Sequence, residues 1–124
     1  MLIRLELPRD KSAPAAARQA IDELRPVPST QVRSDARLLV SELVTNSVRH
    51  GTGDHVVVLL DHEDSGVLRC EVIDQGAGFV PRARPDQPVG GWGLELVEQI
   101  ASSWGVREGS THVWFAIHAD DVTR

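Results

Sequence analysis

The stretch that decides the fold is SELVTNSVRHG, residues 41–51. It closes a predicted helix that begins near Ser29 or Thr30 and stops at Gly51, a residue type that commonly ends helices. Glu42 and Asn46 are four residues apart, so they lie one above the other. They fall at the edge of a broad apolar face, formed at helical spacing by Val32, Ala36, Leu39, Val40, Leu43 and Val44.

Upstream of this helix, the sequence predicts a strand and a shorter helix. Met1 to Leu7 alternates apolar and charged residues, which indicates a strand. A helix follows from Ser12, whose hydroxyl is placed to cap it, to about Leu24. Pro26 and Pro28 prevent that helix from continuing.

Downstream, two strands are predicted on either side of a charged turn. The continuous apolar run at residues 56–60 is typical of a strand covered on both faces. Residues 61–66 are expected to form a turn in which His62 is solvated. In the next strand, residues 67–74, the apolar residues alternate with charged ones and Asp74 is in phase with the apolar face. A carboxylate directed inward needs a partner, because burying it alone is costly.

The last third of the chain completes the fold. Residues 80–89 hold three prolines and indicate a mobile loop. An amphipathic helix follows from Leu94 to Ile100, and residues 104–118 indicate a closing hairpin that turns at residues 108–110. Strands with helices on one face predict a two-layer α/β sandwich with a mixed, mostly antiparallel sheet, in one domain spanning residues 1–124.

Charge and cysteine content exclude several classes of function. The net charge is −5, the pI is about 5.4 and the basic residues are scattered, which argues against direct nucleic-acid binding and against anionic membranes. Cys70 is the single cysteine, which fits a reducing compartment, and we expect it to be a core residue. No apolar stretch is long enough to span a bilayer. These features predict a cytoplasmic protein.

Three blocks carry the candidate chemistry: residues 41–51, Asp74-Gln75-Gly76-Ala77-Gly78-Phe79, and Gly90-Gly91-Trp92-Gly93-Leu94. Each block alone has an ordinary explanation, as a polar helix flank, a hairpin turn or a flexible hinge. Together they supply what a nucleotide requires. Glycines let the backbone approach a ligand closely, and N–H groups at the start of the helix at Leu94 meet phosphate.

Side chains in the first two blocks complete this set. Asp74 accepts a hydrogen bond from an exocyclic amine such as that of adenine. Asn46 supplies an oxygen of the hard type that magnesium takes. Arg49 follows Asn46 by one helical turn and neutralises phosphate charge.

The three blocks resemble the N box and the two glycine boxes of the GHKL ATP-binding fold, which histidine kinases, gyrase and MutL share. The nearest likeness is to bacterial anti-sigma-factor serine kinases of the RsbW type and their small actinobacterial relatives. Residues 41–51 are close to the N box of that branch, and Trp104-Gly105-Val106 and Val113-Trp114-Phe115 resemble its closing hairpin.

The resemblance implies a role for each matching residue. Asn46 would hold magnesium, and Asp74 would bind the adenine amine. Glu42 matches a glutamate that acts as base on the acceptor hydroxyl in the kinase branch, and histidine kinases lack a catalytic glutamate there. Residues 80–89 would form an ATP lid. The glycines would shape the adenine pocket or lie against the phosphates: Gly76, Gly78, Gly91 and Gly93.

The resemblance therefore implies an ATP- and magnesium-binding regulator that phosphorylates a serine on a STAS-type antagonist of an anti-sigma factor. Its partners would be that antagonist, a sigma factor or both, and the family suggests a homodimer. Three alternatives remain open at this point: a non-catalytic module that senses nucleotide, a detached histidine-kinase catalytic domain, and a purely structural interaction domain.

Overall fold

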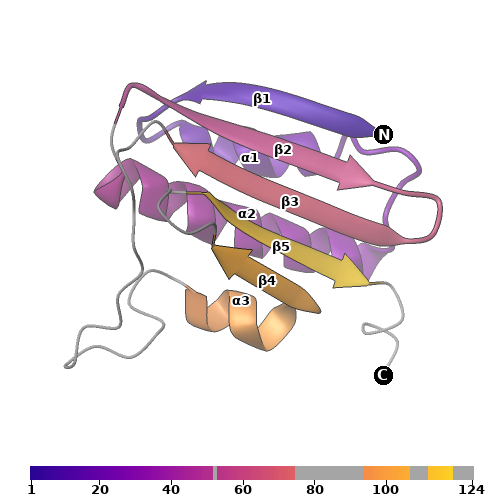
Figure 1. Cartoon of the computed structure of the whole chain (residues 1–124). Helices are drawn as coiled ribbons and strands as arrows, with labels where there is room; N and C mark the ends of the chain where they lie inside the picture. The colour runs from indigo at the N-terminus through magenta and orange to yellow at the C-terminus, as the bar shows by residue number, and fades with distance from the viewer. Residues whose placement is uncertain (52, 75–93, 107–111, 119–124) are drawn as a thin grey trace.

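A computed structural model describes residues 1–51, 53–74, 94–106 and 112–118. The elements are β1 (Leu2–Pro8), α1 (Ala13–Ile21), α2 (Thr30–His50), β2 (His55–His62), β3 (Val67–Asp74), α3 (Leu94–Ile100), β4 (Ser103–Val106) and β5 (Val113–His118). This order matches the sequence prediction (Figure 1). The predicted lid at residues 80–89 and the hairpin turn at residues 108–110 lie outside the described residues.

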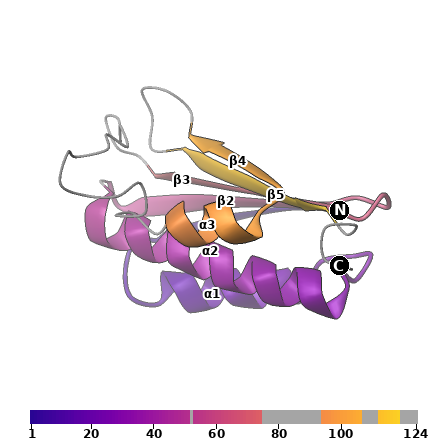
Figure 2. The ribbon, with the colours of Figure 1, turned by 90° about the horizontal axis from the view of Figure 1, so that it is seen from below.

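The five described strands form one sheet in the order β1-β2-β3-β5-β4. All four pairings between these strands are antiparallel, so the described part of the sheet lacks the parallel component that a mixed sheet would have. The three helices of the described residues lie on one face of the sheet, with α2 central to that layer (Figure 2). The prediction of a two-layer α/β sandwich is confirmed.

The core lies between the sheet and the helices. Alternate residues of β2, β3 and β5 point into it, and α2 contributes the apolar face that its periodicity predicts. α1 is rich in alanine, and these small side chains let it pack closely against the sheet and α2. The core residues with no exposed surface include Ala13, Ala17, Ile21, Ala36, Leu39, Val40, Val44, Val56, Val58, Leu60, Leu68, Cys70, Val97, Phe115 and Ile117.

The two predicted helix caps differ in the structure. Ser29 caps α2 as its type predicts, because its Oγ accepts a hydrogen bond from the Val32 N–H at 3.2 Å. The prediction for Ser12 is wrong, because its side chain does not cap α1 and its hydroxyl donates to Asp10 instead. Hydrogen bonds from the Ser12 side chain and backbone hold the pKa of the Asp10 carboxyl below its usual value.

Strand β2 is longer and less covered than predicted. It continues through Asp61 and His62, two residues into the expected turn. Val57 and Leu59 are half-buried, because they lie on the face of the sheet opposite the helices. The apolar run at residues 56–60 is therefore covered fully on one face only.

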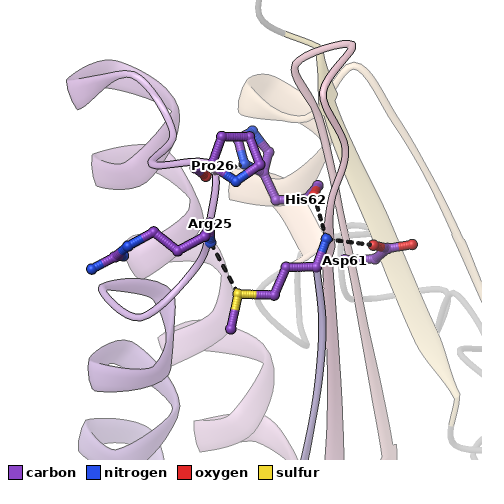
Figure 3. A network of polar contacts seen from close by, with 5 residues as sticks. Arg25, Pro26, Asp61 and His62 are labelled. Atoms are coloured by element: carbon purple, nitrogen blue, oxygen red, sulfur yellow. Dashed lines mark hydrogen bonds and ion pairs between the residues drawn. The ribbon is translucent and has the colours of Figure 1, made fainter.

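The expectation that His62 is solvated is wrong, since its exposed fraction is 4%. Its Nδ1 lies 2.6 Å from the Pro26 carbonyl oxygen, and its own carbonyl accepts from the Met1 ammonium at 2.9 Å. The Met1 sulfur also accepts a hydrogen bond from the Arg25 N–H at 3.1 Å. Figure 3 shows Arg25 and Pro26, in the loop after α1, close to His62 at the end of β2. These contacts tie the start of β1 to the loop between α1 and α2.

Within the described ranges, no helix combines the length and the apolar character needed to cross a bilayer.

Candidate functional site

Asp74 is the last residue of β3 and lies at the edge of the core. It follows Leu68, Cys70 and Val72 on the inward face, so the alternation of the strand carries its carboxylate under the sheet, as the sequence predicts. Its exposed fraction is 9%. A carboxylate this buried requires hydrogen-bond donors, because its desolvation is otherwise uncompensated.

The last turn of α2 supplies one of those donors. Ser47 is itself buried, and its Oγ donates to Asp74 Oδ2 at 3.2 Å. Figure 1 shows the C-terminal end of α2 beneath the end of β3, which is where this contact forms. A residue in the helix thereby holds a carboxylate in the sheet, and the two elements share one site.

Gly51 lies against the same carboxylate. A Cβ at this position would lie 2.2 Å from Asp74 Oδ2 and 2.6 Å from the Ser47 carbonyl oxygen, distances too short for any side chain. The φ of Gly51 is −76°, which other residues also adopt. Gly51 ends the helix where the sequence predicts, but the structure requires glycine there for the close contact with Asp74.

Asn46 and Glu42 lie one turn apart on the flank of α2, and both are half-buried. Within the part of the chain that the structure describes, Asn46 Nδ2 is buried and has no hydrogen-bond partner. An unsatisfied buried amide costs free energy, so such a group often indicates a ligand site. The amide fits a phosphate oxygen through Nδ2 or, turned over, a magnesium ion through its oxygen.

The structure says less about the other residues that the sequence predicts for the site. Arg49 is exposed at the end of α2, where it is accessible to an anionic ligand. Leu94 begins α3, but its side chain is in the core, so only its backbone is available to a ligand. The four glycines at positions 76, 78, 91 and 93 lie outside the described residues.

Arg9 is a residue that the sequence analysis missed. Its Nε donates to the Gly53 carbonyl at 2.6 Å, and its Nη1 donates to the Val48 and Ser47 carbonyls at 2.9 and 3.3 Å. A guanidinium at these carbonyls also complements the negative end of the α2 dipole. Arg9 therefore fixes the helix turn that carries Ser47 and Gly51.

Two other chemistries find no support in this region. Burial raises the pKa of the Cys70 thiol, so it stays protonated inside β3 and is not a nucleophile, as expected for a core residue. Among the described residues, no three His, Cys, Asp or Glu side chains converge on a common metal position. A magnesium ion at Asn46 would take most of its ligands from phosphates and water, as this ion commonly does.

Comparisons with known proteins bear on the family and the fold of this chain. The family model described as "Histidine kinase-like ATPase domain" matches residues 7–117. A similar solved structure is the crystal structure of the RsbU and RsbW domains of Rv1364c from Mycobacterium tuberculosis, with a TM-score of 0.70 and 22% identity. The match covers 95% of this chain and 32% of that one, and at this identity it bears on the fold alone. No curated protein matches.

Proposed function

Because the chain belongs to the family of histidine kinase-like ATPase domains, we propose that it binds ATP with magnesium at the junction of α2 and β3. The observation that carries the proposal is the buried Asp74 carboxylate, which accepts a hydrogen bond from Ser47. The residue next to Ser47 is Asn46, whose buried amide nitrogen has no partner among the described residues. Asp74 accepts a hydrogen bond from the adenine amine. Asn46 and the exposed Arg49, which precede and follow Ser47 in α2, bind the phosphates. When bound, magnesium neutralises phosphate charge, with Asn46 as its protein ligand.

We propose further that the domain is a regulatory serine kinase. Glu42 accepts the proton of a serine hydroxyl on a partner protein, and the serine oxygen attacks the γ-phosphorus. The bond from that phosphorus to the bridging oxygen breaks, and ADP leaves. Glu42 suits this role because it lies one turn from Asn46 on the same half-buried flank. A carboxylate beside a polyanion weakens binding, so its use is better explained by proton transfer.

The proposed partner class is supported by the resemblance of residues 41–51 to anti-sigma-factor kinases and by the fold likeness to a structure that contains an RsbW domain. We propose a STAS-type antagonist as the phosphate acceptor, and a sigma factor as a second partner. A homodimer of this chain is part of the same proposal.

Nucleotide binding is tested by calorimetric titration of the purified protein with ATP, with and without magnesium. The parent should bind ATP more tightly when magnesium is present. Asn46→Ala should fold normally and lose most of this magnesium dependence, because it removes the proposed protein ligand. If Asn46→Ala responds to magnesium as the parent does, Asn46 belongs only to the polar flank of α2.

Kinase activity is tested with Glu42→Gln, which keeps the shape of the side chain and removes its basicity. The variant should bind ATP as well as the parent or slightly better, since a negative charge near the phosphates is lost. Transfer of labelled phosphate to a STAS-type protein should slow by about 10²–10⁴-fold, the usual cost of losing a general base. An unchanged transfer rate would show that Glu42 is not the base. ATP binding without transfer to any such acceptor would favour a nucleotide-sensing module.

A further inference from the structure

Ser47 is an unusual residue for the interior of a helix that packs on a sheet. Alanine has the higher helix propensity, and a serine inside a helix commonly returns its hydroxyl to a carbonyl of the preceding turn. Here the hydroxyl leaves the helix and donates to Asp74 Oδ2 at 3.2 Å, in a contact where both side chains are buried. The Ser47 hydroxyl therefore holds the Asp74 carboxylate and does not bond to the backbone of its own helix.

The backbone around Ser47 is held as firmly as its side chain. The Ser47 carbonyl accepts from the Gly51 N–H at 2.8 Å and from Arg9 Nη1 at 3.3 Å. Gly51 packs directly against Asp74 Oδ2, because a Cβ on residue 51 would lie only 2.2 Å from that oxygen. The Ser47 hydroxyl and the Gly51 backbone therefore both contact the same oxygen atom, Asp74 Oδ2.

We propose that Ser47 is a positioning residue that determines base specificity by fixing the rotation of the Asp74 carboxylate. The inference rests on the proposed binding of the base at Asp74. The terminal torsion of an aspartate is broad and roughly two-fold, so an unheld carboxylate samples several orientations. With Oδ2 held by Ser47, the carboxylate presents one fixed acceptor direction to the base.

A fixed acceptor discriminates between bases by the group at the six position of the purine. Adenine carries an amine there and donates to the carboxylate. Hypoxanthine and guanine carry a carbonyl there, which places two acceptors opposite each other and leaves both without a donor. A carboxylate that rotates, or that takes up a water molecule, relieves this conflict and tolerates the carbonyl better. Removal of the Ser47 hydroxyl should therefore lower the preference for adenine more than it lowers the affinity for the phosphates.

The experiment measures dissociation constants for ATP and for inosine triphosphate, on the parent and on Ser47→Ala. The two bases differ in the group at the six position and in the adjacent N1, which carries a proton only in hypoxanthine. The parent should prefer ATP, and Ser47→Ala should reduce the ratio of the two constants by about three- to tenfold, the typical net effect of one hydrogen bond. Ser34→Ala is the matched control, because Ser34 is exposed on the same helix, and its ratio should equal that of the parent. The ratio of the two dissociation constants distinguishes a positioning role from a general loss of stability, since a loosened fold lowers the affinity for both nucleotides alike.

Ser47→Cys provides a second measurement, because it preserves the approximate volume of the side chain and offers only a weak donor. It should also lower the ratio, by less than Ser47→Ala. If the parent prefers ATP and both variants keep the parental ratio, Ser47 does not position Asp74, and the proposed ATP site still stands. If the parent binds neither nucleotide, both the inference and the proposed function are overturned.

Discussion

The two ends of the β2–β3 hairpin each bury one ionisable side chain, but they satisfy it differently. At one end, His62 places Nδ1 on the Pro26 carbonyl, and the Met1 ammonium meets the His62 carbonyl and approaches Asp61 (Figure 3). At the other end, Asp74 accepts from Ser47, and the neighbouring Asn46 amide has a buried nitrogen without a partner among the described residues.

The comparison separates a structural polar contact from a ligand site. Burial alone does not distinguish them, because His62 and Asp74 are 4% and 9% exposed. A carbonyl oxygen only accepts hydrogen bonds, so Nδ1 of His62 carries the proton and donates to the Pro26 carbonyl. At the Asp74 end, by contrast, the residue next to Ser47 is Asn46, whose buried amide nitrogen has no partner in the described part of the chain. A bound nucleotide would supply the missing acceptor. Changes at the two ends should therefore have different consequences.

The largest effect is expected from adding one methyl group at Gly51. Its Cβ would overlap Asp74 Oδ2 and the Ser47 carbonyl, so the carboxylate or the helix turn must move. A displaced carboxylate loses its hydrogen bond to the base and leaves a buried group unsatisfied, at a cost of up to about 3 kcal/mol, or roughly 100-fold in affinity. Gly51→Ala should lower ATP affinity by about that factor in calorimetry, and should also lower the free energy of unfolding by about 1–3 kcal/mol through overpacking.

Gly66→Ala is the matched change at the other end of the hairpin. Gly66 has a φ of 90° in the turn between β2 and β3, so alanine is strained there for a backbone reason. It should lower the free energy of unfolding by about 1 kcal/mol and leave ATP affinity unchanged. Equal loss of ATP affinity in Gly51→Ala and Gly66→Ala would show that the loss follows stability and not the site.

The second effect compares the two buried ionisable residues directly. Asp74→Asn keeps the shape of the side chain but adds a donor, so it should weaken ATP binding by about 1–3 kcal/mol. It should change the free energy of unfolding by less than about 1 kcal/mol, because the amide oxygen still accepts from Ser47. The preference for ATP over GTP should fall in the same titrations, and an unchanged preference would remove Asp74 from base recognition.

His62→Ala should show the reverse pattern. It leaves the Pro26 carbonyl without its donor and opens a cavity, so chemical denaturation should show a loss of about 2–3 kcal/mol. ATP affinity measured well below the unfolding transition should equal that of the parent. A large loss of ATP affinity in this variant would mean that the two ends of the hairpin are coupled.

The sequence predicts those parts of the site that depend on local periodicity. Asp74 is directed inward because side chains alternate along a strand, and Glu42 and Asn46 share a flank because of the helical repeat. His62 was predicted wrongly, because a charged turn composition gives no sign of a carbonyl 36 residues away. The same limit hides the contact of Ser47 with Asp74, which spans 27 residues, and the contacts of Arg9, which span 38 to 44.

The smallest effect on stability and ATP affinity is expected from replacing two arginines, one near each end of the β2–β3 hairpin. Each of them donates hydrogen bonds to backbone carbonyls at or just after the end of a helix. Arg9 donates to carbonyls in the last turn of α2, and Arg25 Nη1 donates to the Asp22 and Leu24 carbonyls just after α1. Both should contribute modestly to stability, since exposed or half-buried hydrogen bonds of this kind have small net energies. Thermal unfolding of Arg9→Ala and Arg25→Ala should therefore show similar, small decreases in Tm.

Their effects on ATP affinity should differ, because only Arg9 holds the turn that carries Ser47 and Gly51. Arg9→Ala should weaken ATP binding by about three- to tenfold, the effect of a loosened turn that still forms its backbone hydrogen bond from Gly51 to Ser47. Arg25→Ala should bind ATP as the parent does. The Arg9→Lys variant keeps the charge but not the fork of donors, so it should recover only part of the lost affinity. If Arg9→Ala binds ATP like Arg25→Ala, the end of α2 is held by the core alone, and the Arg9 contacts are structural like those at the His62 end.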